Sequence, residues 1–394
     1  MNPLFERLHP YPFERYRVLL QSASPPDDLA PVDLSIGEPK HPTPAVLRDA
    51  LVADLDGLGR YPSTAGIPQL REAIAGWLMR RFSPVAIDPG TNVLPVLGSR
   101  EALFAVAQTI LNPYADDVVL CPNPFYQIYE GAALMTGATP VYVPLTPDAA
   151  MTMDWSSVAT DIWPRVRLVY VCSPGNPTGT VMKLDEWRYL FEQSDKFGFV
   201  IAADECYSEL YRSGDIPPIG GLQAAATLGR DLTRLVAFGS LSKRSNAPGL
   251  RSGYVAGDPA IIAQFLKYRT YHGSAMSPIV QSASIAAWND EEHVIANRAL
   301  YDEKFTALAP ILSSVVDIEM PQAGFYFWAK VRDGNDQSFS QRAYHQYNVR
   351  VLPGSFLGRE SNGQNPGAGR IRIALVDTLD QCLIAARRLQ KMAA

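Results

Sequence analysis

The chain has 394 residues, of which 47% are hydrophobic, and its formal net charge is −5. This length is sufficient for two domains of ordinary size, each with its own core. The negative charge and the dispersed basic residues disfavour nucleic acid or an anionic membrane as a partner. No apolar stretch approaches the ~20 residues that cross a bilayer, and the charged, proline-interrupted N-terminus lacks the apolar core of a signal peptide. We therefore expect a cytoplasmic protein.

The four cysteines are expected to be unpaired structural thiols. No two of them form a CxxC pair, and most lie in apolar, strand-like surroundings, which is typical of buried thiols in a reducing compartment. The histidines are scattered, so the sequence predicts no metal site. The cysteines are Cys121, Cys172, Cys206 and Cys382.

The first elements predicted along the chain are helices. A short amphipathic helix is expected over residues 9–20, and a further one from about residue 48. The next begins at Pro68, because proline suits the first turn of a helix and is followed by apolar residues at helical spacing. Those apolar residues are Leu70, Ile74, Trp77 and Leu78.

Strands and helices then alternate. The strands are continuous apolar runs, which indicates burial on both faces and a mostly parallel sheet with helices on either side. In such a sheet, ligands bind beyond the carboxyl ends of the strands. The predicted strands cover residues 92–97, 116–122, 139–145, 165–172, 199–204, 234–240 and 252–257.

The pattern changes after about residue 285. A helical region is followed by strands over 325–331 and 370–376 and by a final helix, which predicts a smaller α/β domain. A helix over about 285–310 is expected to bridge the two. We expect an N-terminal arm with part of the small domain, a large domain and a small C-terminal domain, over residues 1–47, 48–285 and 286–394.

Polar residues follow several of the predicted strands. Gly98, Ser99 and Arg100 open a helix, whose free main-chain N–H groups suit a phosphate, although a plain helix cap explains them equally well. Asn176 lies in a loop rich in proline and glycine, where a simple turn is the alternative reading. Asp204 closes a buried strand, which is unfavourable unless it meets a cation or hydrogen-bond donors; a solvated acidic loop is the alternative.

The segment after the strand at 234–240 carries the strongest signal. Ser240, Ser242 and Arg251 suit a phosphate group, because an arginine grips phosphate oxygens at two points. Lys243 places an amine beside them, and burial near positive charge lowers the pKa of an amine. A phosphate site, a reactive lysine and a buried carboxylate at one sheet edge fit pyridoxal phosphate. Phe125 or Tyr126 could cover the cofactor ring.

Eight motifs, in this order, resemble the class I and II aminotransferases of the fold-type I pyridoxal-phosphate enzymes. The resemblance covers nearly the whole chain and implies an α/β fold with a large domain, a mostly parallel sheet and a smaller C-terminal domain. The motifs are LSIGEPKHPTP, YPSTAGIPQLREAIAGW, LGSREALF, NPFYQIYEGA, SPGNPTGT, ADECYSEL, SLSKRSNAPGLRSGY and GRIRIALV.

The resemblance also implies residue roles. Lys243 matches the lysine that binds the cofactor covalently, Asp204 the partner of the ring nitrogen, and Tyr207 and Asn176 the partners of the ring oxygen. Tyr126 matches the stacking residue. The phosphate site matches Ser240, Ser242, Arg251 and the main chain of Ser99 and Arg100. Tyr61 matches a tyrosine that reaches the neighbouring subunit's phosphate, so a homodimer is implied.

The α-carboxylate of the substrate is expected at Arg372, beside the main chain of Gly37. An arginine among apolar residues on a strand requires an anion, and the family has an arginine here. Arg370 is the rival, because it faces the same side of a regular strand. A plain surface arginine is the third reading.

The N-terminal segment and Arg244-Ser245-Asn246 resemble a narrower group, the bacterial succinyldiaminopimelate aminotransferases. The implied reaction transfers an amino group from N-succinyl-LL-2,6-diaminopimelate to 2-oxoglutarate, in lysine biosynthesis. Another amino donor (aspartate, alanine or an aromatic amino acid), a pyridoxal-dependent carbon–sulfur lyase and a non-catalytic binding module remain alternatives. The candidate cations for the remaining carboxylates of the substrate are Lys40, Arg15, Arg17 and Arg359, although each also fits a solvated surface charge.

Overall fold

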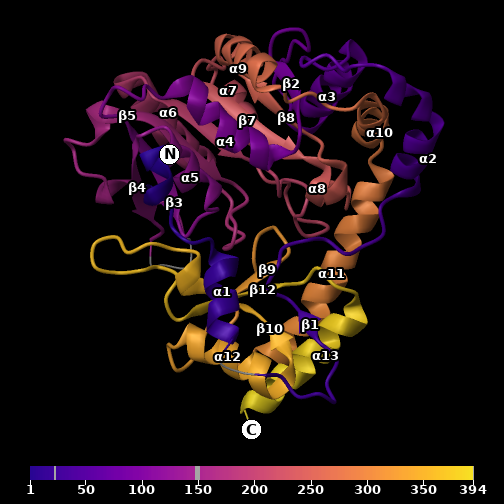
Figure 1. Cartoon of the computed structure of the whole chain (residues 1–394), viewed down its shortest axis with the longest axis vertical. Helices are drawn as coiled ribbons and strands as arrows, with labels where there is room; N and C mark the ends of the chain where they lie inside the picture. Colours follow the sequence, from indigo (N-terminus) through magenta and orange to yellow (C-terminus); the bar gives the residue numbers. More distant parts are fainter. Residues whose placement is uncertain (22–23, 147–150, 394) are drawn as a thin grey trace.

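A seven-stranded sheet forms the centre of the larger lobe (Figure 1). The computed structural model describes residues 1–21, 24–146 and 151–393. The strand order is β2-β8-β7-β6-β5-β3-β4, and β8 alone runs against its neighbours in this sheet. The predicted α/β fold with a mostly parallel sheet is confirmed. The strands are β2 (Val93–Val96), β3 (Val118–Asn123), β4 (Thr139–Pro144), β5 (Val166–Cys172), β6 (Val200–Asp204), β7 (Leu235–Ser240) and β8 (Gly253–Gly257).

The reversed strand β8 has a direct consequence for the polar residues. Its first residue, Gly253, pairs with the last residues of both neighbouring strands, Ser240 of β7 and Val96 of β2. The start of β8 therefore lies at the edge where the parallel strands end. Arg251, which precedes β8, comes to the same edge as Asp204 at the end of β6.

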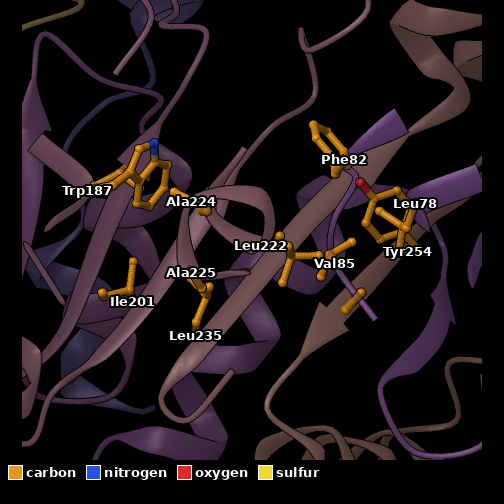
Figure 2. Packing of buried hydrophobic residues seen from close by; sticks show 14 of the residues in the cluster. Leu78, Phe82, Val85, Trp187, Ile201, Leu222, Ala224, Ala225, Leu235 and Tyr254 are labelled. Atoms are coloured by element: carbon orange, nitrogen blue, oxygen red, sulfur yellow. The ribbon is translucent and has the colours of Figure 1, made fainter. Parts of the chain in front are cut away.

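Helices cover both faces of this sheet, and each face has its own apolar core. Along β7, Leu235 and Ala237 pack on one side, and Val236 and Phe238 on the other. Figure 2 shows part of the first core, where Trp187 and Leu222 pack near Leu235. Burial on both faces explains the continuous apolar runs. The first face is covered by α3 (Pro68–Arg81), α6 (Leu184–Phe197), α7 (Gly221–Thr227) and α10 (Pro278–Asn289), the second by α4 (Ser99–Ile110), α5 (Ile128–Met135) and α9 (Pro259–His272).

The smaller lobe is built on a three-stranded sheet of order β11-β12-β9 and a short strand pair, β1 with β10. Val32 and Leu34, from the first part of the chain, belong to its core together with Phe327 and Ile371. Its elements are β1 (Val32–Asp33), β9 (Tyr326–Lys330), β10 (Val349–Arg350), β11 (Leu352–Pro353), β12 (Arg370–Ala374), α12 (Asp336–Tyr347) and α13 (Leu379–Gln390).

The helix that joins the lobes is α11 (Glu292–Leu312), which descends from α10 toward α13 (Figure 1). The sequence predicted one helix over about 285–310, whereas α10 ends at Asn289 and α11 begins two residues after Asp290. The chain turns here because Asp290 is extended, with φ −111° and ψ 126°.

The N-terminal arm lies along both lobes. Its helix α1 (Pro12–Leu20) contacts α12, and α2 (Ala45–Ala53) packs against α10. Among the helices of the described residues, none is both long and apolar enough to cross a membrane.

Candidate active site

A cavity of about 530 Å³ opens at the carboxyl edge of the seven-stranded sheet. It is lined by side chains from both lobes and from the N-terminal arm. Twelve of the thirteen residues predicted for the site line it: Gly37, Ser99, Arg100, Tyr126, Asn176, Asp204, Tyr207, Ser240, Ser242, Lys243, Arg251 and Arg372.

Lys243 lies in the short helix α8 (Leu241–Arg244), which follows β7 directly. Ser240 caps this helix, since its hydroxyl oxygen accepts a hydrogen bond of 3.1 Å from the main-chain N–H of Ser242. The Lys243 ammonium donates to the main-chain oxygen of Gly37. Burial lowers the pKa of Lys243 to about 8, and the positive charge of Arg372 acts in the same direction. The amine is therefore closer to its reactive, neutral form than an exposed lysine.

Asp204 ends β6 and is almost fully buried. One carboxylate oxygen accepts a hydrogen bond of 2.6 Å from the Tyr129 hydroxyl, and the other accepts one of 3.3 Å from the main-chain N–H of Cys206. Burial raises the pKa of Asp204, and these donors act against that shift. Asp204 still lines the cavity, so it can accept a hydrogen bond there from a protonated ring nitrogen.

Three segments form a cradle of donors at one end of the cavity. Gly98 precedes α4 with φ +81°, and a Cβ atom at this position would lie 2.3 Å from a guanidinium nitrogen of Arg251. Glycine is required because the backbone approaches so closely and adopts a left-handed conformation. Ser240 donates a hydrogen bond of 2.9 Å to Ser242. A helix N-terminus, two hydroxyls and an arginine fit a phosphate group.

Arg372 enters the cavity from β12 and is held by both lobes. One guanidinium nitrogen donates to Asn176 over 3.0 Å and another to the main-chain oxygen of Ser35 over 2.8 Å. The remaining Nε is buried and has no hydrogen-bond partner among the residues that the structure describes. An arginine with an unused buried donor fits a carboxylate. The rival, Arg370, does not line the cavity and donates to the main-chain oxygen of Trp328.

The side chain of Tyr326 explains why residue 37 is a glycine. A Cβ atom at position 37 would lie 1.9 Å from the Tyr326 hydroxyl, so any larger residue would displace one of the two segments. The Tyr326 hydroxyl lies 3.0 Å from the Tyr207 hydroxyl. Burial raises the pKa of both tyrosines, so both hydroxyls remain neutral hydrogen-bonding groups at neutral pH.

The sequence missed several residues that line the cavity. Arg100 was predicted through its main chain, yet its side chain also donates to the hydroxyl of Tyr126, and both residues line the cavity. Cys206, expected to be only structural, lines the cavity and donates to Ser99 over 2.8 Å. Tyr326 and two residues of the arm also lack a local sequence signal, because only the tertiary fold brings them here. The arm residues are Tyr11 and Phe13.

The cations sought for further carboxylates lie elsewhere. Lys40 pairs with Asp377, and Arg359 forms a two-point ion pair with the buried carboxylate of Glu130, with N–O distances of 2.8 and 2.7 Å. Neither lines the cavity, nor do the other two candidates, Arg15 and Arg17.

Two aromatic residues predicted for the site, Phe125 and Tyr61, do not line the cavity. Phe125, named with Tyr126 for the ring face, is buried against Tyr142 and does not line the cavity. Tyr61 is fully exposed and contributes nothing to the cavity of its own chain. Its predicted place is the site of a neighbouring subunit.

The fold and the cavity together define a fold-type I pyridoxal-phosphate enzyme: an amine, a carboxylate and a phosphate cradle meet at the carboxyl edge of the large sheet. The family "Aminotransferase class I and II" matches residues 30–389. The chain therefore belongs to this family of enzymes, which use pyridoxal 5′-phosphate.

Named relatives agree with this assignment. An aminotransferase structure from Neisseria meningitidis is 51% identical, with a TM-score of 0.97 and full coverage of both chains. The LL-diaminopimelate aminotransferase of Aquifex aeolicus is 31% identical and covers 92% of this chain and 91% of its own. A structure titled probable N-succinyldiaminopimelate aminotransferase, from Thermus thermophilus, is 25% identical, with a TM-score of 0.82, covering 97% of this chain and 99% of that one.

Proposed function

We propose that this aminotransferase transfers the amino group of N-succinyl-LL-2,6-diaminopimelate to 2-oxoglutarate, a step of lysine biosynthesis in the cytoplasm. The observation that carries the proposal is Arg100, an arginine of the cavity in addition to Arg251 at the phosphate cradle and Arg372. The α-carboxylate uses one cation, Arg372, and the substrate carries two further carboxylates. Arg100 is exposed on the cavity wall and offers a cation to one of them.

The charge and shape of the cavity support the same substrate. Its described lining residues include four cations and two carboxylates, a balance that favours polyanionic ligands. The cations are Arg100, Lys243, Arg251 and Arg372, and the acids are Glu38 and Asp204. Apolar side chains of the lining, Phe13, Ile36 and Leu357, suit the methylene chain that separates the carboxylates.

The residue roles follow from the chemistry of each group. When bound, pyridoxal phosphate supplies an aldehyde that bonds to amines and a ring that accepts electrons from the substrate carbon. Lys243 holds the cofactor and, through its Nζ atom, moves a proton from the substrate α-carbon. Arg372 and the adjacent main chain of Gly37 orient the α-carboxylate, so that the α-carbon lies near that amine.

The other side chains hold the cofactor in place. Asp204 accepts the hydrogen bond of the protonated ring nitrogen, and its negative charge keeps that proton bound. Tyr207 and Asn176 contact the ring oxygen, and Tyr126 covers the ring face. The phosphate is held by Arg251, by the hydroxyls of Ser240 and Ser242, and by the main chain of Ser99 and Arg100.

We also propose that two chains share their active sites in a homodimer. Tyr61 is fully exposed, and the segment that precedes it exposes more than half of three large apolar residues, Val52, Leu55 and Leu58. Such an exposed apolar segment is typical of a subunit interface. A tyrosine on it can reach the phosphate site of the partner.

One residue of the cavity, Glu38, supports a second candidate for the amino donor. Glu38 lines the cavity and could pair with the free distal ammonium of LL-diaminopimelate, which the succinyl group converts to an uncharged amide. The Aquifex relative is named for that substrate. Succinylation removes the ammonium and adds a carboxylate, so the two donors differ in charge at one end alone.

The test is a screen of amino donors with 2-oxoglutarate as acceptor. We expect the highest kcat/KM with the succinylated donor, and a loss of preference for it in Arg100→Gln. A preference for LL-diaminopimelate that Glu38→Gln abolishes would establish the second candidate. Preference for aspartate, alanine or an aromatic amino acid would reject both donors. Turnover of cystathionine without an acceptor would identify a lyase instead.

A further inference from the structure

The residues that follow Lys243 do not face the cavity. Arg244 is buried against the rings of Trp77 and Trp288, at 5.3 and 5.0 Å from their centroids, and pairs with Glu291. Ser245 lies 2.8 Å from Nε2 of His293. These side chains, which the cofactor and substrate sites leave unexplained, dock on the corner between α10 and α11.

Asn297 of α11 is the centre of this docking. Its amide nitrogen donates to the main-chain oxygens of Lys243, over 3.1 Å, and Arg244, over 3.3 Å. A helix as short as α8 leaves these carbonyls without partners inside the helix. The Asn297 amide therefore supplies the missing donors at the residue that carries the reactive amine.

The side-chain oxygen of Asn297 takes part in hydrogen bonds as well. Its amide oxygen accepts from Asn246 over 2.7 Å and lies 2.9 Å from Nδ1 of His41. Lys304 contacts Nε2 of the same imidazole and donates to the main-chain oxygen of Leu375 over 3.0 Å. Because an ammonium is only a donor, Nε2 accepts and Nδ1 carries the hydrogen that binds Asn297.

This chain of hydrogen bonds connects the two lobes. Lys304 lies in the half of α11 that packs into the small lobe, and Leu375 follows β12, which carries Arg372. His41 lies four residues beyond Gly37, whose main-chain oxygen contacts the amine of Lys243. Asn297 of α11 therefore fixes the main chain of Lys243, and the segment that carries Gly37 and His41 fixes its side chain.

We propose that Asn297 is a positioning residue, which with His41 and Lys304 holds Lys243 in its reactive orientation from the helix that joins the lobes. The inference rests on the proposed role of Lys243 as the cofactor-binding lysine. Asn297 does not line the cavity, so it acts through Lys243 and leaves the substrate-binding side chains in place. Its loss should affect proton transfer more than binding.

The test compares Asn297→Ala with the wild-type holoenzyme. We expect kcat to fall about tenfold to a hundredfold, as for a misplaced catalytic group, with KM changed less than about twofold. The pH midpoint of the visible absorbance of the bound cofactor should move by about half a unit or more, since it reports the surroundings of the lysine nitrogen. An unchanged midpoint would overturn the proposal, whether or not kcat fell.

Two further variants separate positioning from loss of stability. His41→Phe/Lys304→Met removes both polar partners at once, which spares the fold from an unpaired buried charge. It should move kcat and the midpoint in the same direction as Asn297→Ala, by less; no movement would overturn the part assigned to these two residues. The control is Asn348→Gly, which removes another buried asparagine, with φ 49°, far from Lys243 in sequence. A midpoint shift in this control would overturn the proposal.

The outcome is distinguishable from failure of the proposed function. If Lys243→Ala retained the pH-dependent change in the visible absorbance of the bound cofactor, the proposed role of Lys243 would fail. If that change were lost in Lys243→Ala yet its midpoint were unmoved in Asn297→Ala, the positioning role alone would fail.

Discussion

Arg372, on the small sheet, donates a hydrogen bond of 3.0 Å to the side chain of Asn176, in a loop that follows a strand of the large sheet. Its other amino group is held by Ser35. The guanidinium is therefore fixed at the junction of the lobes, and its Nε has no hydrogen-bond partner among the described residues. This relationship makes the proposed carboxylate site depend on the relative position of the two lobes.

Arg372→Lys should lower kcat/KM for the amino donor by on the order of a hundredfold, mostly through KM. Lysine keeps the charge but cannot contact a carboxylate at two points while holding Asn176 and Ser35. Arg370→Lys is the matched control, because it changes the same strand outside the cavity. Equal losses in the two variants would contradict the assignment, as would no loss in Arg372→Lys. Steady-state kinetics with varied donor measures both.

Lys243→Ala should lower kcat by about a thousandfold or more, since it removes the proposed covalent anchor and proton carrier together. The pH-dependent change in the visible absorbance of the bound cofactor should disappear as well, because it requires the lysine nitrogen. Lys267→Ala, at an exposed lysine of α9, should behave like the wild type. Rapid multiple turnover by Lys243→Ala would show that another residue carries the chemistry.

Gly37→Ala should lower kcat/KM by about tenfold to a hundredfold, because the new methyl group would lie 1.9 Å from the Tyr326 hydroxyl. In the double variant with Tyr326→Phe, the nearest obstructing atom is gone, so part of the loss should be recovered. A double-mutant cycle in kcat/KM measures this coupling. Strictly additive losses would mean that the contact does not limit activity.

The sequence predicted what depends on short stretches of chain. The apolar runs predicted the strands, Pro68 marked the start of α3, and residues after strand ends predicted most of the cavity lining. Parallel strands carry such residues to one edge, so no long-range information was needed. Arg251 fits the same logic only because β8 is reversed, which the sequence did not reveal.

The features that were missed depend on contacts between distant segments. The requirement for glycine at position 37 comes from Tyr326, and the carbonyl of Lys243 is capped by Asn297. Neither pair is close in sequence, so no local pattern marks them. The helix α12 buries only two apolar side chains, Phe339 and Ala343, and its apolar periodicity is correspondingly weak.

Stability should depend on pH through Glu205, which is 1% exposed. One of its oxygens accepts a hydrogen bond from the main-chain N–H of Gly221, and the other has no hydrogen-bond partner within the described part of the chain. Burial raises the pKa of Glu205 to about 7, from an ordinary value of 4.5. Between these pH values the folded protein binds more protons than the unfolded chain, so this contribution to stability is full below the lower value and is lost as pH rises toward 7.

Glu205→Gln removes this titration while keeping the shape of the side chain. Relative to the wild type, its free energy of unfolding should increase by on the order of 1–3 kcal/mol between about pH 5 and pH 8. Denaturant unfolding at both pH values measures the change. Glu192→Gln, at an exposed position of α6, should show no such trend. Parallel pH profiles for Glu205→Gln and the wild type would mean that Glu205 stays ionised over this pH range, which would contradict the prediction.

Tyr61 offers a test of the proposed shared active site. Because its side chain is fully exposed, Tyr61→Ala should leave the stability of the isolated fold within about 0.5 kcal/mol and weaken cofactor binding instead. Tyr114→Ala, at another exposed tyrosine, should leave cofactor binding unchanged. Equilibrium titration with pyridoxal phosphate gives the two affinities.

Mixing the two inactive or weakened chains provides the sharper measurement. A dimer of Lys243→Ala with Tyr61→Ala has one site in which the lysine comes from one chain and the tyrosine from the other, both intact. At a cofactor concentration too low for Tyr61→Ala alone, the mixture should therefore recover activity after subunit exchange. If each chain used its own Tyr61, both sites of the mixed dimer would remain defective and no activity would return. Recovery requires that the phosphate site of one subunit is completed by its partner.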